Sequence, residues 1–472
     1  MNIKKSLLLI LVFSIFWACS ADACDIPTPR QRFQNKLNSI ISSSPEVYNS
    51  QLGVYVRLVK TNEDLYRRNP DMPLIPASNL KIFISATAIE SLGPDYSYIT
   101  ALYGPPPGDD PEVIDGNLYL WSNGDPSLTE NDLENFAIQL KQMGIKHVKG
   151  DVVGDDSYFD RNHTGVGWKN RYLSIEYAAQ CSSLSLCKNI ITLKIKPNKT
   201  RFTPRCSIIK IKNNTIPARY SAVSVKRVPG TNDIVLNGKV GWHDTLVDTV
   251  TVDNPALFTI FTFARILKEN GITIGGRTRL ISPGEEGAIY AKSRYTIHSS
   301  PPLKTILKEI NKESDNFYSQ QVFKSLGARF KGKGTMENSA AFISEFLDSK
   351  GIDTTTLRIV DGCGLSEMNR CTPRQLVDLL ISMFNSSYRQ EFMDSLPTGG
   401  EGTLEYRLFN LPVRAKTGSL RGHSTLSGYV ITAAGQTLAF SIMVNHHKCS
   451  TYEIQRFQDR LVKALANWKE LL

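Results

Sequence analysis

Apolar and polar residues follow regular patterns near both ends of the chain. Residues 32–41 place apolar side chains at helical spacing, and residues 51–60 and 65–69 alternate as the two strands of a hairpin. Helical spacing returns at 303–312, 315–326, 340–349 and 372–384. Strand patterns follow at 412–419, 427–432 and 437–444, and a last helical pattern covers 452–471.

The region between about residues 94 and 290 has a different character, because its strand patterns are short and closely spaced. A strand pattern at 116–121 precedes a helical pattern at 131–143, residues 190–240 are rich in strand patterns, and 255–271 is typical of a helix. The predicted fold class is therefore α/β. An antiparallel sheet flanked by helices is assembled from both chain ends and carries a large β-rich insertion.

One helical pattern, residues 82–92, is apolar nearly all round, and a Ser-x-x-Lys sequence lies at its start. Residues three apart on a helix are neighbours, so Lys81 would reach the hydroxyl of Ser78. Burial against the apolar helix would lower the pKa of the Lys81 amine, which could then accept the serine proton. We therefore take Ser78 as the candidate nucleophile and Lys81 as the candidate base.

Ser-x-x-Lys is a common sequence, and most matches are solvated surface pairs. A second copy, Ser185 to Lys188, directly precedes the strand pattern at 190–196. A strand cannot hold the two side chains on one helical turn. Only the copy at Ser78 has the helical setting that the chemistry requires.

Two further clusters contain residue types that acyl transfer uses. Ser314-Asp315-Asn316 lies between two helical patterns, and Lys416-Thr417-Gly418-Ser419 lies on a strand pattern. Each has an ordinary alternative interpretation, since Ser-Asp-Asn is a common helix N-cap and Lys-Thr-Gly a common strand end. The three clusters occur in the order and on the elements that a shared site would need.

The chemistry assigns a role to each cluster. Ser314 could relay a proton to a leaving amine, at lower cost beside the positive charge of Lys416. Asn316 could hold Lys81 and a substrate amide. The substrate-binding candidates are Thr417, Gly418 and Ser419, which together with Lys416 would hold a terminal carboxylate. Backbone N–H groups of Ser78 and Ser419 would form an oxyanion hole.

The N-terminus predicts export. Two lysines, an apolar run from Ser6 to Ala18 and the small-x-small sequence 21–23 form a signal peptide over residues 1–23. The apolar run is short for a membrane span. We expect an exported protein in the periplasm or cell envelope. A lipid anchor on Cys19 or Cys24 is the less favoured alternative, since Phe16-Trp17-Ala18-Cys19 is a poor lipobox.

The net charge of +10 over 472 residues indicates which classes of binding partner to expect. A basic exported protein suits anionic envelope polymers or lipid head groups, so peripheral membrane association is a further expectation. The basic residues are scattered along the sequence and no nucleic-acid module is present, so we do not expect nucleic acid as a partner. The length predicts two or three domains. The oligomeric state is not indicated.

Six cysteines lie beyond the signal region, which is compatible with an oxidising compartment. The close pairs Cys181/Cys187 and Cys363/Cys371 could each close a small disulfide loop, although connectivity is not readable from sequence. The chain has no Cys-x-x-Cys or His-Glu-x-x-His, and its seven histidines are dispersed. We therefore expect no metal and no cofactor.

The three clusters resemble those of the class C low-molecular-mass penicillin-binding proteins, the D-alanyl-D-alanine carboxypeptidase/endopeptidase family of serine peptidase family S13. The resemblance extends over nearly all of the mature chain. Further matching segments are 116–120, 124–126, 154–159, 311–316, 361–366, 402–404 and 426–429. In this family the long insert between the first two clusters forms two extra domains, one nested in the other.

The resemblance implies a transpeptidase-like (β-lactamase-like) catalytic domain over residues 24–93 and 291–472. It implies an inserted domain at 94–184 and 243–290 and a nested β-rich domain at 185–242. The implied activity is hydrolysis of the D-Ala-D-Ala bond of peptidoglycan stem peptides and of peptide cross-links, with acylation of the serine by β-lactam antibiotics. Cys363 departs from the family's Asp-Gly-Ser-Gly-Leu-Ser, and we expect altered packing or a disulfide there.

Three alternatives remain. A β-lactamase would use a Glu-held water for deacylation, but the Glu-x-x-x-Asn pattern is absent and the insert is too long. A catalytically idle wall-binding or scaffolding homologue need not keep Ser78, Lys81, Ser314, Asn316 and Lys416 together. A Ser-His-Asp hydrolase of the α/β type would want a Gly-x-Ser-x-Gly elbow, which the chain lacks.

Overall fold

The computed structural model describes residues 27–197, 199–287, 289 and 292–472. The predicted signal peptide, with Cys19 and Cys24, lies outside the described residues. Among the residues that are described, no helix combines the length and the hydropathy that a membrane span requires.

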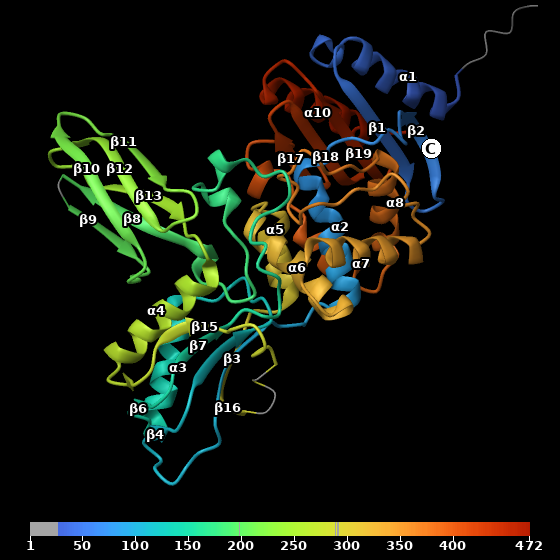
Figure 1. Ribbon diagram of the computed structural model, residues 1–472. Helices are drawn as coiled ribbons and strands as arrows, with labels where there is room; N and C mark the ends of the chain where they lie inside the picture. Colours follow the sequence, from blue (N-terminus) through green and yellow to red (C-terminus); the bar gives the residue numbers. More distant parts are fainter. Residues whose placement is uncertain (1–26, 198, 288, 290–291) are drawn as a thin grey trace, which may run out of the picture.

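Both chain ends meet in one antiparallel five-stranded sheet, as predicted (Figure 1). Its strand order is β17-β18-β19-β1-β2, so the last strand of the chain lies beside the first. The bounds are β1 Gln51–Leu58, β2 Glu63–Arg68, β17 Val413–Leu420, β18 His423–Ile431 and β19 Thr437–Asn445. β18 begins at His423, four residues before the strand predicted at 427–432.

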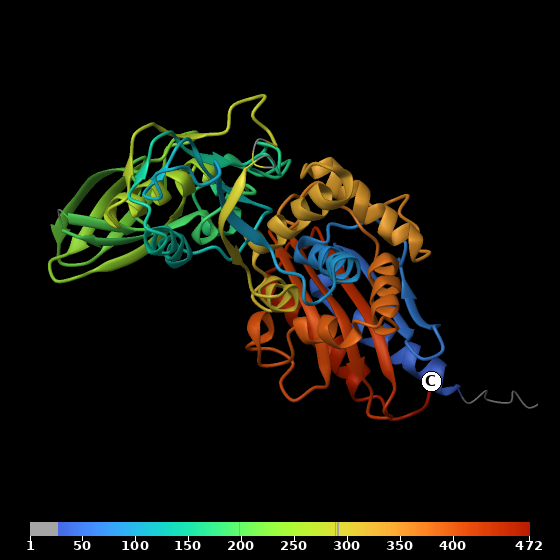
Figure 2. The same ribbon diagram turned by 90° about the horizontal axis from the view of Figure 1, so that it is seen from below.

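Helices cover both faces of this sheet (Figures 1 and 2). Alternate residues of β1 face opposite ways: Val54 packs in one hydrophobic cluster with α1 and α10, and Tyr55 packs in another with the remaining helices. The helices are α1 Pro29–Ser42, α2 Leu80–Leu92, α5 Leu303–Asn311, α6 Asn316–Lys331, α7 Met336–Ser349, α8 Pro373–Phe384, α9 Arg389–Ser395 and α10 Thr451–Ala466. The predicted last helix was too long, because Asn467 caps α10 after Ala466.

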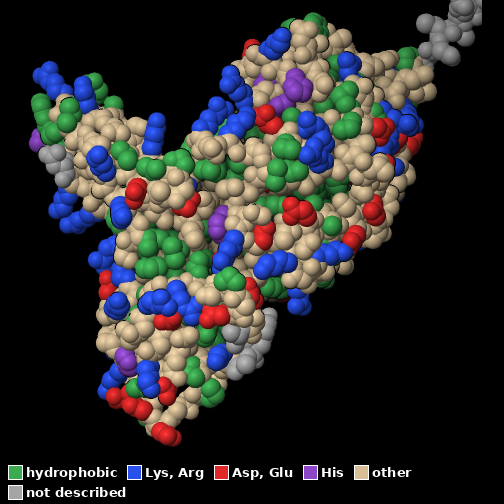
Figure 3. Space-filling model, viewed as in Figure 1, with side chains coloured by type: hydrophobic (Ala, Val, Ile, Leu, Met, Phe, Trp, Pro, Cys, Tyr) green, Lys and Arg blue, Asp and Glu red, His purple; other side chains and the backbone are tan. Residues whose placement is uncertain are grey.

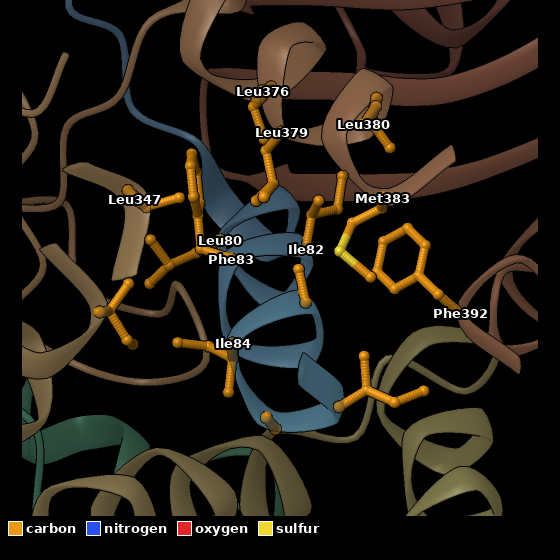
Figure 4. Close-up of a cluster of buried hydrophobic side chains, with 14 of the residues drawn as sticks. Leu80, Ile82, Phe83, Ile84, Leu347, Leu376, Leu379, Leu380, Met383 and Phe392 are labelled. Atoms are coloured by element: carbon orange, nitrogen blue, oxygen red, sulfur yellow. The ribbon is translucent and has the colours of Figure 1, made fainter. Parts of the chain in front are cut away.

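Helix α2 lies in the middle of the helical layer and is buried on every side from Leu80 to Ile89. Figure 4 shows Leu80, Ile82, Phe83 and Ile84 pointing outward from it in different directions, among leucines of α7 and α8. A helix that is apolar all round is stable only when it is enclosed in this way. The helix that begins just after Ser78 is therefore rigidly held by its surroundings.

The inserted region contains a second five-stranded sheet, of order β15-β7-β5-β3-β16, and a small sheet of order β14-β6-β4. Helices α3 (Glu130–Gln142) and α4 (Pro255–Glu269) pack with them in one hydrophobic cluster. The strands are β3 Ile99–Gly104, β4 Val113–Ile114, β5 Leu118–Ser122, β6 His147–Val148, β7 Val152–Asp155, β14 Thr273–Ile274, β15 Thr278–Leu280 and β16 Ser293–Ser299.

Two three-stranded sheets, β10-β12-β11 and β13-β8-β9, form a nested module. This module projects away from the five-stranded sheet β17-β18-β19-β1-β2, which we call the catalytic sheet (Figures 1 and 2). Their bounds are β8 Ile190–Lys196, β9 Lys199–Thr203, β10 Lys210–Ala218, β11 Ala222–Arg227, β12 Asp233–Gly241 and β13 Leu246–Thr251. Residues such as Leu193 and Leu236 pack between the two sheets.

The domain borders stay a prediction, which ends the nested module at residue 242 and the insertion at residue 290. Strand β13 begins beyond residue 242 but pairs with β8 of the nested module, and β16 begins beyond residue 290 but pairs with β3 of the insertion. We propose that the nested module runs to residue 251 and that the insertion ends at about residue 299.

Gly364 closes the space behind the turn that carries Ser78. Its φ is +84°, and a Cβ placed there would lie 1.9 Å from the carbonyl oxygen of Ala77. Gly351 has a similar φ of +73°, but nothing lies within 4 Å of the equivalent position. The two glycines share the backbone strain of substitution and differ in the contact.

We expect Gly364→Ala to destabilise the protein by about 1–3 kcal/mol more than Gly351→Ala, because the contacted atom is backbone and cannot rotate away. Urea unfolding of both variants measures the difference. Equal losses would show that the contact with Ala77 imposes no constraint.

Candidate active site

Ser78 lies in a short 3-10 turn, Ala77–Asn79, that runs directly into α2. Ala77 has a φ of +47°, a left-handed conformation that costs a non-glycine residue about 1–3 kcal/mol. The side chain of Asn79 donates to the carbonyl of Lys416 on β17 (2.8 Å) and accepts from Ser427 on β18 (2.7 Å). These bonds tie the strained turn to the edge of the sheet.

Lys81 is fully buried one turn beyond Ser78. Its Nζ lies 3.0 Å from Ser78 Oγ, and donates to Asn316 Oδ1 and to the Cys363 carbonyl, both at 2.7 Å. Burial lowers the pKa of Lys81 below its ordinary value. A neutral amine has two N–H groups and one lone pair, which matches two carbonyl-type acceptors and one serine hydroxyl.

Ser314 and Lys416 form a second hydroxyl–amine pair. Lys416 Nζ donates to Ser314 Oγ at 2.9 Å and to the Thr417 carbonyl at 3.1 Å. Burial, followed by repulsion from Lys81, lowers the pKa of Lys416 well below its ordinary value. Ser314 has a φ of +60°, so this second hydroxyl is also held on strained backbone.

Asn316 joins the insertion to the rest of the chain, the part built on the sheet β17-β18-β19-β1-β2, which we call the catalytic unit. It is the first residue of α6, after the N-cap Asp315, and its Nδ2 donates to the carbonyl of Tyr177 at 2.8 Å. Its amide nitrogen therefore bonds the inserted region here, while the sequence suggested contact with a substrate amide. The second Ser-x-x-Lys copy separates: Ser185 donates to the Ser182 carbonyl, and Lys188 forms an ion pair with Asp315.

Thr417, Gly418 and Ser419 follow Lys416 along β17, at the sheet edge that faces the Ser78 turn. A Cβ on Gly418 would lie 2.9 Å from the backbone nitrogen of Ser78, so only glycine allows this close approach. Thr417 is nearly buried, and Ser419 is exposed. The structure thus brings all eight predicted residues to one place.

A cleft of about 370 Å³ opens over these residues, with Ser78, Ser314, Asn316 and Ser419 in its lining. The sequence did not indicate its other wall, which comes largely from the insertion. That wall includes Gly167, Lys169, Tyr172 and Tyr177, and Glu367 and Arg421 complete the rim. No sequence signal marks these residues, because their place depends on how the insertion folds back.

Asp361 holds this wall against the catalytic unit. Its carboxylate accepts from the indole Nε1–H of Trp168 (2.8 Å) and from the backbone N–H groups of Gly364 (2.8 Å) and Ser366 (2.7 Å). Lys169 forms an ion pair with Glu367 nearby. The segment 361–366 therefore supports both the Ser78 turn and the insertion loop.

Neither of the two disulfide loops that the sequence spacing allowed is formed among the described residues. All six cysteines among the described residues have free thiols. Cys181 donates to Gln321 Oε1, and Cys363 is buried with its carbonyl turned toward Lys81. Close spacing in sequence does not fix the Cβ geometry that a disulfide needs. In the described part of the chain, no group of His, Cys, Asp or Glu side chains is placed to hold a metal ion.

The chain is similar in sequence to proteins named as D-Ala-D-Ala carboxypeptidases. It is 31% identical to the D-alanyl-D-alanine carboxypeptidase of Actinomadura sp. (strain R39), over 86% of this chain and 80% of the relative. It is 26% identical to D-alanyl-D-alanine carboxypeptidase DacB of Haemophilus influenzae, over 88% and 89%.

Solved structures share the fold. Penicillin-binding protein 4 (dacB) of Haemophilus influenzae matches with a TM-score of 0.80 at 23% identity, over 91% of this chain and 99% of that one. The same protein complexed with a novel β-lactam gives 0.76. The predatory peptidoglycan endopeptidase Bd3459 of Bdellovibrio bacteriovorus gives 0.52 at 17% identity, over 90% and 96%. The predicted fold class is confirmed.

The sequence model described as the D-Ala-D-Ala carboxypeptidase 3 (S13) family matches residues 33–468, which is nearly the whole chain. The family and the enzyme class predicted from the motifs are confirmed. The chain belongs to the D-Ala-D-Ala carboxypeptidase 3 (S13) family of serine peptidases.

Proposed function

We propose that this enzyme hydrolyses the D-Ala-D-Ala bond of peptidoglycan stem peptides as a carboxypeptidase, and peptide cross-links as an endopeptidase, through an acyl-enzyme on Ser78. The observation that carries the assignment of Ser78 is the 3.0 Å distance between its hydroxyl and the buried amine of Lys81. The family membership supports the bond that is cleaved.

In the acylation step, neutral Lys81 accepts the proton of Ser78 as the serine oxygen attacks the carbonyl carbon of the penultimate D-Ala. Asn316 and the Cys363 carbonyl hold the two remaining N–H groups, so the lone pair stays directed at the hydroxyl. Burial favours this neutral form, because a charged amine is costly where water is excluded.

The leaving amine needs a proton when the tetrahedral intermediate collapses. Ser314 donates it and in turn takes up the proton that Lys81 received from Ser78, so that both groups return to their starting forms. Lys416, 2.9 Å from the Ser314 oxygen, stabilises the negative charge that develops there. The backbone N–H groups of Ser78 and Ser419 bind the oxyanion. Each such donor contributes about 3–4 kcal/mol to the transition state in comparable sites. Water then hydrolyses the acyl-enzyme.

Lys416, Thr417 and Ser419 bind the terminal carboxylate of the substrate, and Gly418 lets their strand approach Ser78. A carboxylate beside Lys416 favours the charged form of that amine, which its buried position otherwise disfavours. β-Lactams place a carboxylate and a strained amide in the same positions, so we propose that they acylate Ser78 as well. The β-lactam complex of the Haemophilus influenzae protein supports this.

A peptidoglycan substrate requires the enzyme to be outside the cytoplasm. The basic start, apolar run and cleavage sequence within residues 1–23 support export to the periplasm or cell envelope. Against an idle scaffolding homologue, the described residues retain both hydroxyl–amine pairs at hydrogen-bonding distance.

We expect Ser78→Ala to abolish labelling by a fluorescent penicillin while the protein stays folded. Ser185→Ala is the matched control, because it removes the serine of the second Ser-x-x-Lys and should leave labelling intact. Intact-mass spectrometry after incubation with benzylpenicillin makes the same comparison, because it detects the covalent adduct in each variant. Labelling that survives in Ser78→Ala would place the nucleophile elsewhere.

We expect the rate of acylation at saturating benzylpenicillin to rise with pH as Lys81 loses its proton. Because burial lowers the pKa of Lys81, the rise should level off below the ordinary lysine value of 10.5. Stopped-flow or quench measurements across the pH range give the profile. An inflection at 10.5 or above would exclude Lys81 as the base.

Lys416→Ala should lower kcat/KM at least about thirtyfold for peptides with a free terminal carboxylate, because truncating one partner of a buried charge pair commonly costs about 2–5 kcal/mol. The same peptide with its terminus amidated should be affected less, because it loses the charge beside Ser314 but no carboxylate contact. D-Ala release from the free acid and alaninamide release from the amide, measured alongside unfolding, test this. Equal loss of turnover for both peptides would argue against carboxylate binding.

A further inference from the structure

The net positive charge of this protein resides almost entirely in its nested module. Residues 185–251 contain twelve Lys and Arg against three Asp and Glu, a net charge of +9, while the whole chain carries +10. These residues look scattered along the sequence, but the two sheets gather them into one projecting body (Figures 1 and 2).

Strand register arranges part of this charge in opposed rows. On the solvent face of sheet β13-β8-β9, Lys196 lies opposite Lys199 and Lys194 lies opposite Arg201. All four side chains are exposed. Like charges directly opposite one another on a sheet are destabilising. Such an arrangement is typical of a surface that meets an anionic partner.

The acidic residues of the module do not neutralise these rows. Asp233 lies opposite Lys210, at the other end of its sheet, and Asp244 accepts from Ser221. Asp248 bonds the backbone of Thr249. Among the described residues the ion pairs of the module involve Lys188, Arg205 and Arg227, none of which belongs to the rows.

One end of the module also exposes large apolar side chains. Strands β8, β10 and β12 end at this end of the module, and β9, β11 and β13 begin there. The register shows this, because Leu246 at the start of β13 pairs with Ile195 near the end of β8, and Ala222 at the start of β11 pairs with Lys239 near the end of β12. We call four residues at this end the apolar apex: Ile216, Tyr220, Trp242 and Val247, which are 57–65% exposed.

Cationic side chains surround the apolar apex, and we call them the basic rim: Lys194, Lys196, Lys199, Arg201, Arg219 and Lys239. Lys239 lies opposite Ile216 and over the ring of Tyr220, 5.3 Å from its centroid. At the upper left of Figure 3, hydrophobic side chains at this end of the molecule lie between Lys and Arg side chains.

We propose that this end of the nested module binds the surface of an anionic phospholipid bilayer. Trp and Tyr prefer the interface, where an apolar ring meets polar head groups. Lysines and arginines near an anionic surface each add attraction that salt screens. Both features occur at the same end, and the module projects away from the five-stranded sheet β17-β18-β19-β1-β2 (Figure 2). This inference does not depend on the proposed catalytic mechanism.

Vesicle co-sedimentation of the mature protein tests the proposal. We expect binding to phosphatidylcholine vesicles that contain 30% phosphatidylglycerol, weakening as salt rises, and little binding to phosphatidylcholine alone. Lys196→Gln with Lys199→Gln should raise the lipid concentration for half-binding about thirtyfold, from the typical attraction of two surface lysines. Tyr220→Ser with Trp242→Ser should also weaken binding, with less effect on its salt dependence.

Matched controls lie on the catalytic unit. Lys463→Gln with Lys469→Gln removes two exposed lysines, and Tyr406→Ser with Tyr452→Ser removes two exposed tyrosines, which are 82% and 66% exposed. Both should bind vesicles as the unmodified protein does. Acylation by fluorescent penicillin should be unchanged in all four variants, which shows that each is folded.

Several results would overturn the proposal. One is the absence of vesicle binding, and another is equal binding to both vesicle types. A third is vesicle binding that Tyr220→Ser with Trp242→Ser leaves unchanged and that soluble polyphosphate displaces. This result would indicate that the basic rim binds a flexible polyanion and not a bilayer surface.

Discussion

The site depends on one costly placement, a lysine amine buried without a carboxylate beside it. Taking a charged amine out of water is expensive, so the cost is reduced if Lys81 gives up its proton. The surroundings fit that form, because two acceptors and one hydroxyl satisfy a neutral amine. The same dry environment that destabilises the charged lysine suits it to the role of base that we propose.

Keeping that environment dry and ordered explains much of the surrounding structure. Helix α2 is enclosed on all sides, which fixes the first turn that carries Lys81. Asn79 ties the preceding turn to β17 and β18, and Gly364 and Gly418 allow backbone to approach from two directions. The strained conformations of Ala77 and Ser314 persist because such contacts over-determine them.

The candidate site residues could be predicted because their types and local settings are restrictive. Ser78 precedes an apolar helix, Ser314 precedes a second helix, and Lys416 lies on an edge strand. The wall of the cleft could not be predicted, because Trp168 and Tyr177 reach Asp361 and Asn316 only through the fold of the insertion. Whether the close cysteine pairs form disulfides could not be predicted for a related reason, since sequence spacing says little about side-chain direction. The clustering of basic side chains could not be predicted either, because it depends on strand register. In the sheet, Lys196 lies opposite Lys199 and Lys194 lies opposite Arg201.

The contacts between insertion and catalytic unit have a consequence for engineering a smaller enzyme. Lys324 of α6 is completely buried, and its ammonium donates to the side chain of Asp160 and to the Asn162 carbonyl, both in the insertion. Excising residues 94–299 would remove both partners, and would also strip Asn316 of the Tyr177 carbonyl. An uncompensated cation inside a helix bundle is strongly destabilising. A shortened enzyme would therefore need Lys324 and its neighbours redesigned together, since this insertion has become part of the interior of the domain that it interrupts.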